Sequence, residues 1–178
     1  MAVAHDLCAP RHVSIEQLPE QLPEQLYSMV APGLFMGGTA DDAWVNEPKA
    51  LDYGDDDRGF DAVLTLFSWA QPFGWGVEEL RYGFADSNMR QADLSRVVEA
   101  ARWAYKRWSE GNLVLIRCQA GLNRSGLLTA LVLMQDGLSA EEAIGVIRAE
   151  RGEAALFNRS FVDWLVGDAE SVLAGRFG

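Results

Sequence analysis

The amino-acid sequence predicts an α/β domain with a central, mainly parallel sheet of four to five strands flanked by helices. Short apolar runs bounded by glycine or turn residues indicate buried strands, and segments of helical spacing follow several of them. The helices gather in the second half of the chain, as in folds where helices connect parallel strands. With 178 residues and 49% hydrophobic content, the chain suits one domain, which we place at 31–178 after an irregular lead-in at 1–30.

Two segments predict irregular structure, and four others predict short apolar strands. In the lead-in, the repeat Leu-Pro-Glu-Gln places two prolines four residues apart, which interrupts regular structure. The acidic segment 41–59 predicts a solvated loop, because its three adjacent aspartates do not face one point as a cation site would require. The expected strands span 34–36, 62–67, 79–85 and 113–116.

Capping and stop signals mark the predicted helices. Gly111 stops the first helix, which shows apolar residues at helical spacing. Ser139 and Glu142 form a capping box, and Asn158 is the expected cap of the last helix. The expected helices span 91–109, 127–134, 140–151 and 159–173.

Charge and rare residue types exclude several classes of function. Fifteen basic against 26 acidic residues give a formal net charge of −11, which repels nucleic-acid backbones and anionic membranes. Both histidines, His5 and His12, lie in the first dozen residues, so neither a Cys-His hydrolase site nor a zinc site is easily built. The only cysteines are Cys8 and Cys118, which excludes a disulfide framework.

Hydropathy predicts a cytoplasmic protein. The first eleven residues lack the long apolar core of a signal peptide. The uninterrupted apolar stretches fall far short of a membrane span. We therefore expect no membrane partner.

The chemistry lies in the loop between the strand 113–116 and the next helix, with the sequence Cys-Gln-Ala-Gly-Leu-Asn-Arg-Ser over 118–125. A strand-to-helix turn points backbone N–H groups inward, and the helix N-terminus adds partial positive charge. Such a nest holds a phosphate dianion and favours a thiolate. Gly121 permits the backbone angles that the turn demands. The predicted phosphate-binding residues are Gln119, Ala120, Gly121, Leu122, Asn123 and Arg124.

Three side chains of this segment have predicted roles. Cys118 is the expected nucleophile, because it precedes by six residues an arginine that opens a helix. Arg124 is expected to grip two phosphate oxygens with its planar fork, since a cation at a helix N-terminus is otherwise unfavourable. Ser125 either caps the helix or donates a hydrogen bond to the sulfur, and the sequence leaves both interpretations open.

These residues resemble the Cys-x5-Arg-Ser/Thr signature of the protein tyrosine phosphatases, and the chain from about 30 to 170 resembles their compact dual-specificity branch. The resemblance implies a three-layer α/β sandwich of the phosphatase type. The segment 33–37 is similar to that branch's first strand, and Asp86, 32 residues before the cysteine, to its general acid. The residues similar to its closing segment are Arg151, Asn158, Phe161 and Leu165.

Some assignments have competitors. The family usually has histidine before the cysteine, and here Arg117 stands there; we expect it to pair with an acidic neighbour rather than to contact substrate. Asp86 has the alternative role of an Asx turn or helix cap, and Asp93, the nearest other acid, falls in the helical pattern. The aromatic residues expected in the core rather than at the pocket rim are Trp69, Phe73 and Trp75.

The resemblance implies a cysteine-dependent phosphatase for phosphotyrosine and also phosphoserine or phosphothreonine, acting through a phosphocysteine on a phosphorylated protein or a small phosphoester. We expect phosphate or sulfate to bind the loop, and no metal or cofactor, because the amides and Arg124 replace a metal. One alternative is a non-catalytic phosphate-binding module, which the missing histidine favours. Another alternative is an RNA 5′-triphosphatase, because residues 121–124 resemble the loop of those enzymes. The net charge of this chain disfavours long RNA as a substrate. A phosphoinositide phosphatase would carry lysines in the loop, and 119–123 has none.

Overall fold

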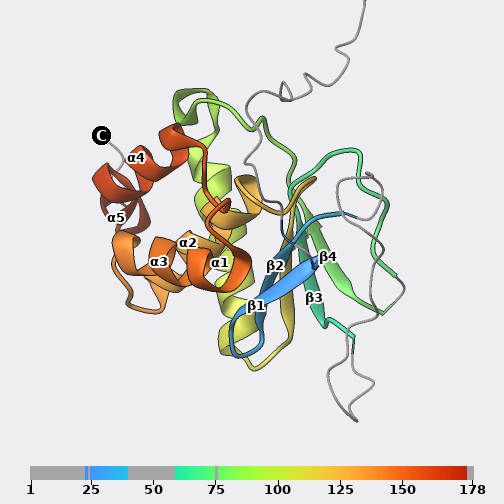
Figure 1. Cartoon of the computed structure of the whole chain (residues 1–178). Coiled ribbons are helices and arrows are strands. Elements are labelled where there is room, and N and C mark those ends of the chain that lie inside the picture. Colours follow the sequence, from blue (N-terminus) through green and yellow to red (C-terminus); the bar gives the residue numbers. More distant parts are fainter. Residues whose placement is uncertain (1–22, 24, 40–58, 75, 176–178) are drawn as a thin grey trace, which may run out of the picture.

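The computed structural model describes residues 23, 25–39, 59–74 and 76–175 (Figure 1). Cys8, the proline repeat apart from Pro23 and Gln25, and the predicted acidic loop apart from Gly59 lie outside these residues. Within the described ranges, no helix is both long enough and apolar enough to cross a membrane.

Five strands form one sheet in the order β1-β2-β5-β3-β4. β1 and β2 are antiparallel, whereas β2, β5, β3 and β4 run parallel to one another. The predicted α/β class and mainly parallel sheet are confirmed, and β1 is an edge strand at the end of the segment expected to be irregular. The domain boundary itself stays a prediction. The strands are β1 (Tyr27–Ala31), β2 (Leu34–Gly37), β3 (Ala62–Thr65), β4 (Glu78–Arg81) and β5 (Val114–Arg117).

The helices agree with the capping signals. Ser139 and Glu142 form the predicted capping box, and Asn158 caps α4. Asp93 is not inside the first helix as predicted: its side chain accepts from the helix's first turn, so it is the N-cap. The last predicted helix is divided at Asp168. The elements are η2, a 3₁₀ turn (Met89–Gln91), α1 (Leu94–Ser109), α2 (Arg124–Gln135), α3 (Ala140–Arg151), α4 (Arg159–Gly167) and α5 (Ala169–Leu173).

Alternate strand residues face opposite sides of the sheet. Figure 1 shows the helices gathered on one side. Leu34, Leu64 and Ile116 face them in the main core. On the other side, Phe35 and Leu115 belong to a smaller aromatic cluster. No residue of a described helix belongs to this smaller cluster.

The parallel strands set the place of the site. β5 is the central strand of the sheet, between β2 and β3. The carboxyl ends of parallel strands meet at one edge, where ligands of open α/β sheets bind. At this edge, Leu66 after β3 donates its N–H to the carbonyl of Arg117, the last residue of β5. Cys118 follows directly.

Candidate active site

The phosphate loop, defined as residues 118–124, is tied to the end of β2. The N–H of Cys118 donates to the carbonyl of Gly37 (3.1 Å), and the carbonyl of Gln119 accepts from the N–H of Thr39 (3.0 Å). Gly121 has a φ of +70°, and a Cβ there would come within 2.4 Å of the backbone of Gly38. The predicted need for glycine at 121 is confirmed, by its backbone angle and by the closeness of β2.

The middle of the phosphate loop presents unpaired donors. The backbone N–H groups of 120–123 donate no hydrogen bond to any described residue. They directly precede α2, where Asn123 stands at the N-cap position without a side-chain capping bond. Unpaired N–H groups at a helix N-terminus form a site for an anion. This geometry supports the predicted binding of phosphate or sulfate.

Cys118 lies at the floor of a small hollow. Its side chain is only 2% exposed, yet it lines this hollow together with Asp86, Asn123 and Arg124. The thiol donates a hydrogen bond to Oγ of Ser125 (3.4 Å), and when the sulfur is ionised the same pair can reverse, with the hydroxyl donating. Ser125 is not the helix cap, because Asn123 holds that position.

The guanidinium of Arg124 is turned toward the protein. Its Nη1 donates to the carbonyls of Leu66 and Phe84 (3.2 Å each), and the group lies 5.6 Å from the ring centroid of Phe67. Its Nε is buried without a hydrogen-bond partner among the described residues. Arg124 is therefore fixed beside the hollow with donors left for a ligand.

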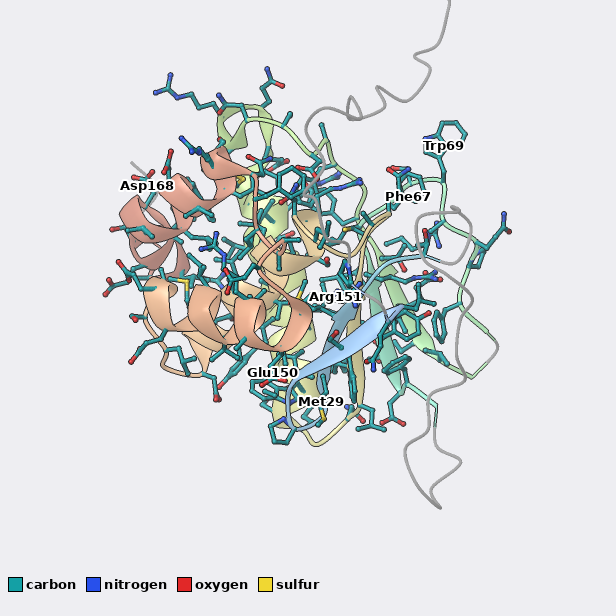
Figure 2. The ribbon with its side chains drawn as sticks, in the orientation of Figure 1. Met29, Phe67, Trp69, Glu150, Arg151 and Asp168 are labelled. Atoms are coloured by element: carbon teal, nitrogen blue, oxygen red, sulfur yellow. The ribbon has the colours of Figure 1, made fainter. Side chains whose placement is uncertain are left out.

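A second arginine holds the phosphate loop from within the protein. Arg151, at the end of α3, is 3% exposed and donates through Nε to the carbonyl of Gly121 (3.1 Å). Its Nη1 donates to the carbonyl of Gln25 (2.6 Å) and to Oγ of Ser28 (3.2 Å). Burial lowers the pKa of Arg151 to about 10, partly offset by the nearby Cys118, so it stays a cation at neutral pH. Figure 2 shows it at the boundary between the helices and the sheet.

Asp86 is joined to the phosphate loop through Asn158. The side-chain amide of Asn158 donates to Oδ1 of Asp86 (2.8 Å), while its backbone N–H donates to Oδ1 of Asn123 (3.0 Å). The helix-cap interpretation of Asp86 is wrong, because Asn88 caps η2 and Asp93 caps α1. The sequence indicated Asn158 as a helix cap and as part of the family's closing segment, but not as a partner of Asp86. The bond between them spans 72 residues and has no local signal.

Arg117 makes the predicted ion pair on the side of the sheet that carries the smaller aromatic cluster. Its Nη2 lies 3.2 Å from the carboxylate of Glu79 and donates to the carbonyl of Gln71 (2.6 Å), while its Nε donates to Oγ1 of Thr65 (2.9 Å). Burial raises the pKa of Glu79, but hydrogen bonds from Thr65, the Phe73 N–H and Arg117 outweigh it and hold the pKa below its ordinary value of 4.5. Arg117 therefore orders the loop after β3.

The aromatic residues of that loop differ in placement. Phe73 packs against the aromatic cluster, as expected. Trp69 is not in the core: it is 67% exposed, because the loop turns it outward past Phe67 (Figure 2). Trp75 lies outside the described residues. Within the described ranges, no group of three His, Cys, Asp or Glu side chains is placed to hold a metal ion.

Comparison with known proteins identifies the family. The family model described as "Dual specificity phosphatase, catalytic domain" matches residues 74–169, so the chain belongs to this family. It is 35% identical over 139 residues to dual specificity protein phosphatase 12 of Mus musculus and 34% over 140 residues to that of Homo sapiens. Each alignment covers 76% of this chain but only 38% of the relative, so the chain spans well under half of their length.

Solved structures share the fold. A mouse putative dual specificity phosphatase complexed with zinc tungstate aligns with a TM-score of 0.68 and 23% identity, over 88% of this chain and 94% of that chain. Human DUSP28 aligns with a TM-score of 0.66 and 21% identity, over 85% and 99%. At these identities the likeness concerns the fold alone, and it agrees with the α/β class predicted from the sequence.

Proposed function

We propose that the chain hydrolyses phosphate monoesters of phosphorylated proteins, at phosphotyrosine and also at phosphoserine or phosphothreonine. One observation carries the proposal: Cys118, Arg124 and Asp86 line a single hollow beside the unpaired N–H groups of 120–123. A nucleophile, an anion clamp and a proton donor are the three groups that this reaction requires.

In the first step, the Cys118 thiolate attacks phosphorus, and an S–P bond forms as the P–O bond to the leaving group breaks. Asp86 gives its proton to the leaving oxygen. The amides of 120–123 and the guanidinium of Arg124 hold the equatorial oxygens. In the second step, water attacks phosphorus, Asp86 takes its proton, and the thiolate leaves with a hydrogen bond from Ser125. The phosphocysteine and the cytoplasmic location stay predictions.

The non-catalytic alternative rested on Arg117 in place of histidine. Two facts weaken that support. Arg117 is engaged with Glu79 and Thr65. The phosphate loop is held independently, by the backbone near Gly37 and by Arg151. No feature of the described residues favours the RNA 5′-triphosphatase alternative over the phosphatase.

The test is turnover of a chromogenic aryl phosphate with and without orthovanadate. We expect hydrolysis that vanadate inhibits, and a Cys118→Ser variant that binds vanadate without turnover. Retained hydrolysis by Cys118→Ser would remove the nucleophile from the proposal. Vanadate binding by the wild type without hydrolysis of the aryl phosphate or of phosphopeptides would support the binding module instead.

A further inference from the structure

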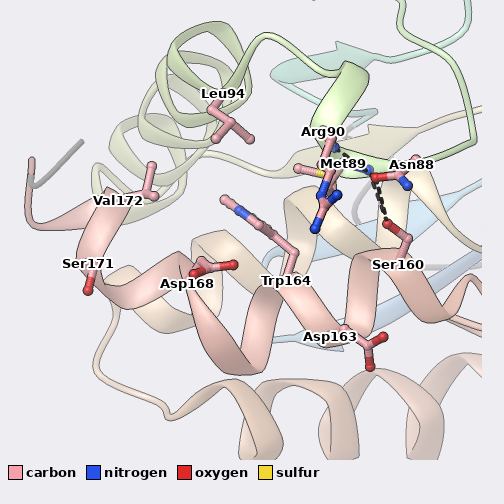
Figure 3. Close-up of a pocket in the computed structure, with 10 residues that line it drawn as sticks. All are labelled: Asn88, Met89, Arg90, Leu94, Ser160, Asp163, Trp164, Asp168, Ser171 and Val172. Atoms are coloured by element: carbon pink, nitrogen blue, oxygen red, sulfur yellow. Dashed lines mark hydrogen bonds between the residues drawn. The ribbon is translucent and has the colours of Figure 1, made fainter. Parts of the chain in front are cut away.

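A groove continues from the catalytic hollow along one side of the protein. The near hollow, of about 490 Å³, shares Asp86, Asn123 and Phe157 with the catalytic hollow. The far hollow, of about 900 Å³, shares Asn88 and Ser160 with the near hollow (Figure 3). The proposed reaction takes place in the catalytic hollow, and it assigns no role to the near hollow or the far hollow.

The far hollow has an apolar floor with one unpaired donor. Trp164 is 8% exposed, and Met89 beside it is also buried. Figure 3 shows the indole of Trp164 projecting into the hollow, between Leu94 and Val172 on opposite elements. The indole N–H makes no hydrogen bond to a described residue, and it is not among the buried atoms that lack a partner, so it is open to solvent. Met89, Leu94, Trp164 and Val172 thus form an apolar patch in a hollow whose other lining residues are polar or charged. Such a patch offers a seat for one apolar side chain of a ligand.

Charges at the rim of the far hollow limit its occupant. Arg90 stands on one side, and Asp163 and Asp168 on the other (Figure 3). None of the three has an ion-pair partner among the described residues. With two carboxylates against one guanidinium, the rim disfavours an anionic lipid surface, as does the net charge of −11.

We propose that this groove holds the polypeptide that flanks the phosphorylated residue of a protein substrate, with a large apolar side chain of that polypeptide seated on Trp164. The inference rests on the proposed phosphatase function and names its substrate class. The near hollow is roughly 10 Å across if round, the length of about three extended residues. The apolar residue therefore follows or precedes the phosphorylated one by about three or four positions. The two rim carboxylates favour a basic residue next to it.

The test uses the Cys118→Ser variant, which separates binding from turnover. Its probes are capped phosphotyrosine, which fills only the catalytic hollow, and an oriented library of phosphotyrosine peptides with degenerate positions on both sides. We expect enrichment of Leu, Met or Phe at one position on one side. A peptide with that residue should bind about tenfold more tightly than capped phosphotyrosine, as expected for one buried apolar anchor.

A matched pair of variants in the same background tests the location. Ser171 is exposed at the far hollow, so Ser171→Tyr fills the hollow without disturbing the core. It should abolish the tenfold advantage of the long peptide. Leu94, at the start of α1, lines the far hollow, whereas Ser109 is exposed at the end of the same helix. Ser109→Tyr should therefore retain the tenfold tighter binding of the long peptide. Thermal melting verifies that both variants fold.

The outcomes separate the two proposals. Normal binding of capped phosphotyrosine with a flat library profile, or a Ser171→Tyr variant that keeps the advantage, would overturn the groove alone. Tighter binding to phosphoinositide vesicles than to any peptide would assign the groove to lipid and overturn the peptide proposal. No binding of capped phosphotyrosine would count against the proposed function, and the groove proposal would fall with it.

Discussion

Replacement of Gly121 by alanine tests whether the shape of the phosphate loop governs activity. The residue has a φ of +70°, and an added Cβ would lie 2.3 Å from the carbonyl carbon of Gly37 and 2.7 Å from Nη2 of Arg151. Gly111 provides a matched control. Its φ is +89°, but an added Cβ there would meet nothing within 4 Å. The two variants share the backbone penalty and differ in the steric clash.

The expected magnitudes follow from this difference. A positive φ costs an alanine about 1–2 kcal/mol, which applies to both variants. Overpacking against fixed backbone adds about 1–3 kcal/mol to Gly121→Ala alone. Ordinary contact begins near 3.4 Å, so the phosphate loop must retreat by about 1 Å from β2. A displacement of that size in a catalytic group lowers the rate by about 10²-fold.

Urea unfolding and aryl phosphate kinetics measure the two effects. We expect Gly121→Ala to lose at least about 1 kcal/mol more than Gly111→Ala. We also expect it to lose vanadate affinity and kcat/KM, while Gly111→Ala keeps both. Equal stabilities of the two variants, together with wild-type vanadate binding by Gly121→Ala, would refute the argument that the loop packs against β2.

Three further predictions concern the surroundings of the phosphate loop. Asn158→Ala frees Asp86 and should lower kcat about tenfold for alkyl phosphates but little for nitrophenyl phosphate; an equal loss for both would exclude a role in positioning the acid. Ser125→Ala should slow hydrolysis of the phosphocysteine about 10–100-fold, seen as a burst in rapid-quench assays, and the absence of a burst would contradict this. Glu79→Gln should cost about 1–3 kcal/mol at neutral pH. Because the pKa of Glu79 is lowered in the folded protein, its contribution to the free energy of unfolding is present above pH 4.5 and is lost as the pH falls through the folded pKa. The free energies of unfolding of the wild type and Glu79→Gln, measured against pH, should therefore converge in acid. A constant difference between them would contradict the ion pair.

Local signals account for what the sequence predicted correctly. The strands and helices follow apolar periodicity and caps such as Ser139 and Asn158. The turn at Gly121 follows from the need for a positive φ between a strand and a helix. These features depend on residues close in the chain, and a sequence displays them directly.

Long-range contacts account for the features that the sequence did not predict. The strand β1 lies in a stretch with weak signals, and its place depends on pairing with β2 and on Arg151, 123 residues from Ser28. The prediction that Trp69 packs in the core is wrong, and the loop that carries it is ordered by Arg117 and Glu79 from other strands. The link from Asn158 to Asp86 likewise appears only when α4 packs beside η2.

The bonds of Arg151 have a consequence for any shortened form of this protein. One guanidinium joins the carbonyl of Gly121 to the carbonyl of Gln25 and the hydroxyl of Ser28. A fragment cut at residue 31 would keep every proposed reacting group but would leave a buried cation without its N-terminal acceptors. Loss of catalysis in such a fragment would then arise from a loop without its support rather than from the loss of a reacting group, and shortened forms should begin upstream of residue 25.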